Sequence, residues 1–146
     1  MNHKLDNLLG HYCDELNYNP VKTTIHTLKD LYDMKIHPQV FHGTLGLTAK
    51  KYHSIEGINV GALLFLGIYL VKKGFTDEET QKACEEFSGI LRENESAKKC
   101  EIFDSVLEDK NGMKCIIRNT IDLLQRFIDH LEQEMEDVDC RKASMI

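Results

Sequence analysis

Apolar residues recur every three or four positions along most of this chain, which is the spacing of amphipathic α-helices. Asn17 to Asn19 interrupt the first stripe, and Asn19-Pro20 then predicts a new helix start, with asparagine as the N-cap and proline in the first turn. No stretch alternates apolar and polar residues over enough positions to predict a β-strand. The pattern therefore predicts an all-α protein, with its clearest stripes in residues 5–16, 21–32, 84–91 and 116–131.

A nearly unbroken apolar stretch predicts a central helix from Glu56 to Lys73, and we expect it to be the most buried helix of a compact helical bundle. Gly57, Gly61 and Ala62 would form a small-residue face on this helix, which another backbone can approach closely. Gly74 follows two lysines and fits the left-handed position that commonly ends a helix.

The segment before the central helix is ambiguous. His37-Pro38 marks a boundary, because the residue before a proline avoids the α region. Val40 to Tyr52 then fits either a helix softened by Gly43 and Gly46 or a loop. The pattern does not choose between the two.

The second half of the chain is expected to hold three helices. Thr76 to Glu79 is a capping box, which predicts that a long helix begins there. A shorter helix is expected from about Ala97 to Leu107, followed by a turn at Asp109 to Gly112. The last helix is expected to start at Met113, and its acidic end, Glu132 to Asp139, is expected to be solvated or frayed.

Length and composition fit one soluble domain. The chain has 146 residues, of which 42% are apolar and 29% charged, enough to bury a core without disulfides. We place a single helical domain at residues 1–136 and an acidic, polar tail at residues 137–146. The net charge of −6 argues against nucleic acid and anionic membrane surfaces as partners, because both need a basic patch.

The N-terminus has no apolar segment after a basic start, so we expect no signal peptide and a cytoplasmic protein. The longest apolar run, Ile58 to Val71, has 14 residues, fewer than the roughly 20 needed to cross a bilayer. The five cysteines are an odd number, and we expect them to be reduced thiols. No Cys-x-x-Cys occurs, which removes zinc ribbons, thioredoxin-type motifs and covalent haem attachment.

The histidines and carboxylates show no catalytic or metal-binding pattern. Neither His-x-x-x-His nor Glu-x-x-His occurs. We therefore interpret the seven histidines as surface, cap or core-edge residues, with His11 and His26 at the core edge. The sequence also has no serine nucleophile elbow, phosphate-binding loop or dinucleotide fingerprint.

Two cysteines are better candidates for chemistry. Cys100 follows two lysines, and Cys115 follows Lys114 in the first turn of the expected last helix. Cations and a helix N-terminus both favour a thiolate, and an antiparallel helix pair could bring the two sulfurs together. The alternative is that both are small buried apolar residues, the usual fate of a free cysteine.

The run from Glu56 to Gly67 resembles the Cys-Gly-Ala-x-x-Gly-Ala-Leu-x-x-Leu-Gly segment of the redox-active C_GCAxxG_C_C family, whose members are small, helical and marked by four cysteines. Upstream, the similarity extends to Tyr18–Val21 and Phe41–Gly46. Downstream, Cys100 and Cys115 fall near the family's third and fourth cysteines.

This resemblance covers roughly residues 5 to 131 but departs from the family at the thiol site. Pro20 and Glu56 stand where the family has its first two cysteines, and Ile58 replaces the motif alanine. The resemblance implies a compact helical domain around an ancestral thiol centre. A four-thiolate metal site or two disulfides cannot form with two sulfurs missing.

Two reduced versions of the family's site are compatible with the resemblance. In the first, Cys100 and Cys115 form a dithiol or disulfide and are the catalytic residues. In the second, Glu56 replaces a thiolate ligand, and together with His53, Cys100 and Cys115 it binds a transition metal, zinc or iron.

Two functions follow as hypotheses. The first is a thiol-based redox or metal-handling protein that uses Cys100 and Cys115. The second is a non-catalytic helical binding or dimerisation domain, a homo-oligomer that kept the fold and lost the thiol site, and the missing cysteines favour it. An enzyme with a pocket near Gly43 to Gly61 finds no activated nucleophile in the sequence to support it.

Overall fold

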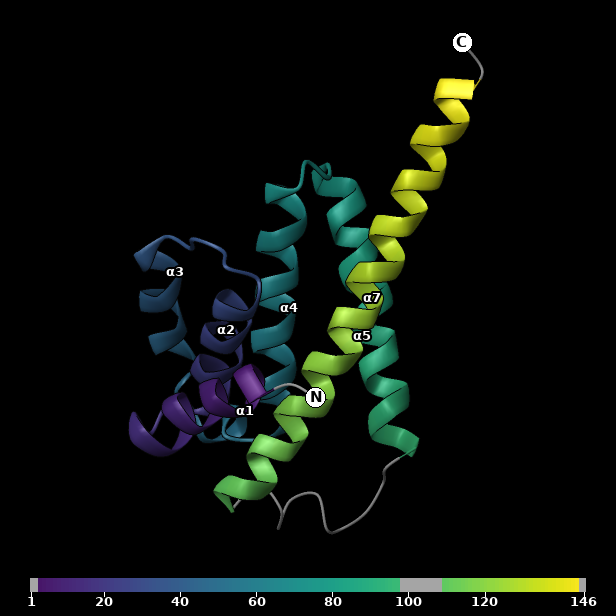
Figure 1. Ribbon diagram of the computed structural model, residues 1–146. Helices are drawn as coiled ribbons and strands as arrows, with labels where there is room; N and C mark the ends of the chain where they lie inside the picture. The colour runs from purple at the N-terminus through teal and green to yellow at the C-terminus, as the bar shows by residue number, and fades with distance from the viewer. Residues whose placement is uncertain (1–2, 98–108, 145–146) are drawn as a thin grey trace.

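The computed structural model describes residues 3–97 and 109–144, and within these ranges the chain is all-helical, as the apolar pattern predicts. Figure 1 shows α4 in the middle of the bundle, with α2 and α3 on one side and α5 and α7 on the other. In chain order the elements are α1 (His3–Leu9), the π-helical turn η1 (Gly10–Glu15), α2 (Pro20–Leu31), α3 (Pro38–Gly43), the 3₁₀ turns η2 (Thr44–Leu47) and η3 (Lys50–Tyr52), α4 (Ile55–Lys72), α5 (Asp77–Ala97) and α7 (Lys110–Ser144).

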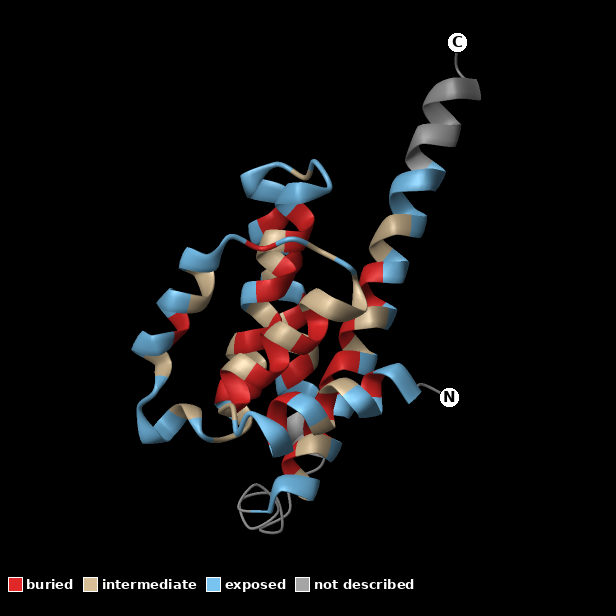
Figure 2. Cartoon of the chain, turned by 60° about the vertical axis from the view of Figure 1, so that its left-hand side comes forward, coloured by how far each residue is buried: buried red, intermediate tan, exposed pale blue. Residues whose placement is uncertain are grey.

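Helix α4 is central but is not the most buried helix. It packs on α2, α5 and α7, and the buried residues gather along the centre of the bundle in Figure 2. Eight of its 18 residues are buried, against seven of 12 in α2. The expectation for α4 was wrong in this detail, because one side of the helix is left uncovered: Leu64 is 38% exposed and Val71 is 51% exposed.

The small-residue face of α4 is confirmed as a place of close backbone approach. A Cβ atom on Gly61 would lie 2.9 Å from both the Thr24 Cβ and the Val21 carbonyl oxygen on α2. A Cβ on Gly57 would lie 1.8 Å from the Tyr52 carbonyl oxygen. These two glycines allow α2 and η3 to pack against α4 without a clash.

Local capping chemistry sets several helix ends where the sequence predicts them. The Asn19 Oδ1 atom accepts a hydrogen bond of 2.9 Å from the Lys22 backbone N–H at the start of α2. In the capping box before α5, the backbone N–H of Thr76 donates to Glu79 Oε1 at 2.9 Å, and the backbone N–H of Glu79 donates to Thr76 Oγ1 at 3.1 Å. Gly74 follows α4 with a φ of +95°, a conformation that favours glycine.

The ambiguous segment before α4 is neither one helix nor one loop. It forms the short helix α3, which starts at Pro38, and the two 3₁₀ turns η2 and η3. The His37 ring caps α3 by accepting a hydrogen bond of 3.1 Å from the Gln39 backbone N–H. Helix α3 lies beside the outer side of α2 in Figure 1, and η3 packs against α4.

The last helix starts earlier than expected. It begins at Lys110 rather than Met113, because Asp109 caps it by accepting a hydrogen bond of 3.2 Å from the Asn111 backbone N–H. The predicted turn at Asp109 to Gly112 was therefore wrong beyond its first residue. Ala97 ends α5, and the rest of the helix expected up to Leu107 lies outside the described residues.

The acidic end of the chain is helical rather than frayed up to Ser144. Helix α7 extends past the end of α4 in Figure 1, so no other described helix lies beside its last turns. The Tyr69 hydroxyl donates a hydrogen bond to the Glu132 carboxylate near the point where α7 leaves the bundle. Residues 133–137 are exposed, as expected for a solvated face.

Helix α4 is long and apolar enough to cross a membrane by length and composition, and no other helix in the described ranges meets that criterion. The core helix of a soluble protein meets the same criterion, and 44% of this window is buried within the bundle. The observation therefore carries little weight for a membrane location.

Candidate functional site

Of the expected thiol pair, only Cys115 lies within the described residues. Cys100 lies outside the described residues, so its approach to Cys115 stays a prediction. The Cys115 side chain is exposed and has no disulfide partner among the described cysteines. Cys115 is therefore not a small buried apolar residue, so the interpretation of both cysteines as core residues is wrong for Cys115.

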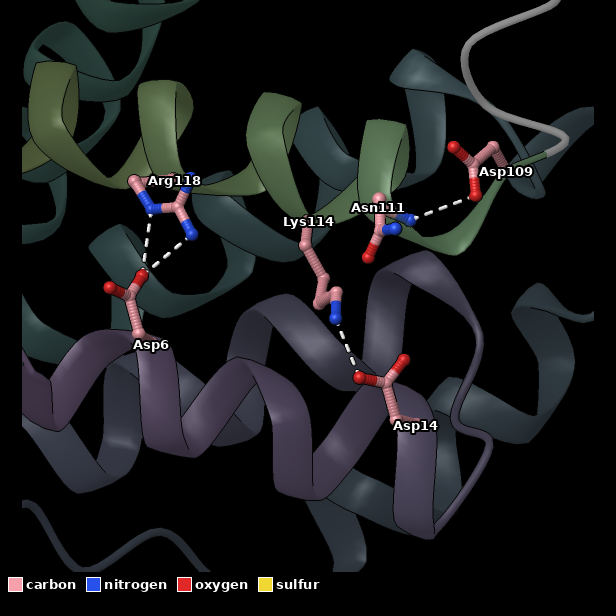
Figure 3. Close-up of polar contacts among 6 residues, drawn as sticks. All are labelled: Asp6, Asp14, Asp109, Asn111, Lys114 and Arg118. Atoms are coloured by element: carbon pink, nitrogen blue, oxygen red, sulfur yellow. Dashed lines mark hydrogen bonds and ion pairs between the residues drawn. The ribbon is translucent and has the colours of Figure 1, made fainter.

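The surroundings of Cys115 differ from those expected. Since α7 begins at Lys110, Cys115 lies in the second turn of the helix, where the favourable effect of the helix N-terminus has largely faded. The neighbouring Lys114 Nζ lies 2.5 Å from Asp14 Oδ2, so a carboxylate already neutralises that cation. Figure 3 shows this ion pair next to the one between Arg118 and Asp6, whose closest atoms, Nη2 and Oδ1, are 2.6 Å apart. These contacts join α7 to η1 and α1.

The ligands expected for the mixed metal site do not come together in the described part of the chain. Glu56 and His53 are both exposed, and the Glu56 carboxylate is 3.5 Å from the Lys51 ammonium. No group of three or more His, Cys, Asp or Glu side chains that could hold a metal occurs among the described residues. Any site that includes Cys100 lies beyond them.

Two other cysteines behave as packing residues. Cys13 is buried, and its burial raises the pKa of the thiol. Cys84 is half-buried on α5, and burial raises its thiol pKa as well. A raised pKa keeps the thiol protonated and unreactive at neutral pH, so neither residue is a candidate nucleophile.

A groove between α2 and the α3–η2 segment is a candidate site that the sequence analysis missed. It has a volume of about 230 Å³. One wall comes from α2 and the residue preceding its cap, and the other from the α3–η2 segment. The lining residues are Tyr18, Lys22, His26, Pro38, Phe41, His42 and Leu45.

Stacked rings form the body of this groove. His26 stacks on Phe41 with ring centroids 4.1 Å apart and an interplanar angle of 21°. The Tyr18 and His26 ring centroids are 5.1 Å apart. Tyr12, which does not line the groove, stacks on Tyr18 with ring centroids 5.6 Å apart. Rings in contact at these distances stabilise one another and form a continuous aromatic surface.

Two lysines border the aromatic surface. The Lys22 Nζ lies 4.4 Å from the Tyr18 ring centroid, and the Lys29 Nζ lies 5.6 Å from the Phe41 centroid. Both distances fall within the range of a cation–π interaction. The ring faces and ammonium groups therefore meet at the same surface.

His26 is a neutral ring in this groove. Burial, followed by the positive charges of Lys29 and Lys22, lowers its pKa to about 4, while the nearby Asp30 carboxylate opposes the shift. Tyr12 donates a hydrogen bond to the Asp30 carboxylate, and burial followed by this bond raises the tyrosine pKa. At neutral pH the groove thus has an uncharged imidazole between two ammonium groups.

A signal for this groove was present in the sequence. Lys22 and His26 are four residues apart and so lie on one face of α2, and Tyr18 lies just before the N-cap of that helix. The second wall could not be found in this way, because Val40 to Tyr52 had no decisive pattern. We interpreted His26 only as a core-edge residue, and it is half-buried.

Comparison with known proteins leaves the site to be judged on its own geometry. No protein-family model, no curated protein and no solved structure matches this chain.

Proposed function

We propose that this chain is a non-catalytic helical binding domain whose ligand site is the aromatic groove between α2 and α3. The observation that carries the proposal is the row of contacting rings, Tyr18, His26 and Phe41, which are each half-buried and line a groove of about 230 Å³. Ligand sites in proteins are concave and mostly apolar, with a few polar groups that fix orientation. This groove has that composition.

The lining supports binding rather than catalysis. It contains no cysteine, serine or carboxylate that could act as a nucleophile or general base. Its half-buried imidazole, His26, has no hydrogen-bonded acid–base partner among the described residues, and its lowered pKa leaves it uncharged at neutral pH. The groove thus offers surface and charge for recognition.

The experiment is a two-dimensional ¹H–¹⁵N NMR titration of the full chain with indole, a neutral planar ring. We expect saturable shifts that map to residues on α2 and α3. Leu45→Arg should abolish them, because Leu45 is 57% exposed at the groove and can be changed without opening the core. Leu64→Arg, a matched change at an exposed leucine on α4, should leave them intact.

Shifts confined to the uncovered side of α4, or shifts that do not saturate, would contradict the proposal. So would a Leu45→Arg variant that binds indole as well as the parent chain does.

Thiol redox chemistry is a second candidate, favoured by the exposure of the Cys115 thiol. In this proposal Cys100 and Cys115 each lose a proton and together lose two electrons to an oxidant such as hydrogen peroxide, forming one disulfide. Peptide mapping after mild peroxide treatment should recover a Cys100–Cys115 peptide pair, with Cys13 unmodified. Recovery of intermolecular Cys115 disulfides alone would remove this candidate.

A further inference from the structure

We propose that the groove binds a small aromatic carboxylate, with the ring against Tyr18, His26 and Phe41 and the carboxylate on the Lys22 ammonium. This inference rests on the proposed binding function and assigns its ligand class. The charge of the groove, the position of its ammonium group, the rings of its lining and its size each narrow that class.

Charge is the first restriction. Lys29 is matched by Asp30, since its Nζ lies 3.3 Å from Asp30 Oδ1. Lys22 has no carboxylate within ion-pair distance among the described residues, and it lies over a ring that lines the groove. This unmatched ammonium at the groove favours a ligand with a single negative charge.

The position of that ammonium is the second restriction. Lys22 is half-buried on α2, one helical turn from His26 on the same face, and Tyr18 lies just before the N-cap of that helix. The cation–π contact of Lys22 holds its Nζ over the Tyr18 ring, 4.4 Å from the ring centroid. A carboxylate bound there extends from a ring that lies along the groove, and an ionised acceptor makes a stronger hydrogen bond than a neutral one.

The nature of the lining is the third restriction. Three of the seven lining residues present rings in mutual contact, while Pro38 and Leu45 add apolar surface. An aromatic ligand gains from ring–ring geometry beyond the area it buries, which a saturated ring of similar size does not.

Size is the fourth restriction. A volume of about 230 Å³ is below the roughly 300–1,000 Å³ of pockets for drug-sized ligands. The groove therefore suits a ligand of about one ring. A nucleotide has a base, a sugar and several negative charges, so it is too large for this volume and carries more charge than the single unmatched ammonium can balance. Neutral His26 adds no second positive charge.

The test compares three probes of nearly one shape by NMR titration of the full chain: benzoate, its neutral isostere benzamide, and cyclohexanecarboxylate, which has the charge without the aromatic face. We expect benzoate to bind about tenfold more tightly than either of the others, as a charge-assisted hydrogen bond and a ring contact allow. High salt should reduce its advantage over benzamide, because screening weakens the ion pair.

The matched variants are Lys22→Met, which keeps the length of the side chain and removes its charge, and Lys82→Met on the exposed side of α5. Lys22→Met should bind benzoate and benzamide equally, and Lys82→Met should keep the tenfold preference. Lys22→Gln serves as a second neutral variant, so that a folding defect in one does not decide the result.

The outcomes separate the two proposals. If benzamide binds the groove as tightly as benzoate, the ligand does not need a carboxylate and the proposed ligand class is wrong, but the proposed binding function stands. Cyclohexanecarboxylate that binds as tightly as benzoate overturns the aromatic class. If neither the three probes nor indole binds the groove, both the proposed ligand class and the proposed binding function are wrong.

Discussion

At the scale of single residues, His26 links the groove to the stability of the fold. Its pKa is about 4 in the folded chain, below the ordinary value of about 6.5 in an unfolded one, because burial disfavours the charged ring. Above pH 6.5 the ring is neutral in both states. Between pH 6.5 and 4 the unfolded chain takes up a proton that the folded chain does not, so the free energy of unfolding decreases as pH falls.

We therefore expect His26→Phe, which keeps a ring against Phe41 and removes the titrating group, to lose less stability than the parent chain between pH 7 and pH 4.5. Urea unfolding at the two pH values measures the difference, and the His26 ring resonances report its pKa directly. Equal losses in the two proteins would show that His26 does not contribute to the acid response.

Two glycines on α4 should respond in opposite ways to substitution. Gly61→Leu forces a side chain against Thr24 and the Val21 carbonyl, and should cost about 1–3 kcal/mol of unfolding free energy. Gly67→Ala meets no atom within 4 Å and should stabilise the chain by up to about 1 kcal/mol, since alanine is the better helix residue. Thermal and urea unfolding test both. An unchanged Gly61→Leu variant would contradict the close packing of α2 on α4.

At the scale of the element, the start of α5 depends on its capping box. Thr76→Ala removes the acceptor for the Glu79 backbone N–H and should cost about 1 kcal/mol. Gln81→Ala, an exposed position on the same helix, should change stability by less than half of that and is the control. Urea unfolding compares the two, and equal effects would mean that the cap does not stabilise the helix in the folded chain.

The helix ends also show which boundaries follow from local capping patterns and which depend on packing. Asn19, Thr76 and Gly74 mark helix ends with hydrogen bonds or a φ angle that involve only their near neighbours in the chain, so the sequence predicts these boundaries. Asp109 has the same capping chemistry, but the glycine at position 112 suggested a turn, and the helix instead starts at Lys110. A single glycine in a first helical turn is tolerated when the helix behind it packs well.

At the scale of the whole molecule, apolar burial rather than ion pairing attaches α7 to the bundle. The Arg118–Asp6 pair in Figure 3 is about half exposed at both side chains, so we expect Asp6→Asn to cost less than about 1 kcal/mol, and less still in high salt. Ile121, in contrast, is fully buried, and Ile121→Ala should cost about 2–5 kcal/mol. Denaturant unfolding ranks the two variants, and a larger loss for Asp6→Asn would reverse this assignment.

The sequence by itself determined the fold class, most helix boundaries and the room that Gly57 and Gly61 leave for another backbone, because apolar periodicity, capping and the absence of a Cβ are local properties. It also directed attention to Cys115, whose neighbours along the chain looked activating. Only the tertiary structure decided that Asp14, a hundred residues away, neutralises Lys114. In the same way, Phe41 reaches His26 because the α3–η2 segment packs beside α2. Contacts between residues distant in sequence depend on how the helices pack, which no local pattern encodes, and the groove consists of such contacts.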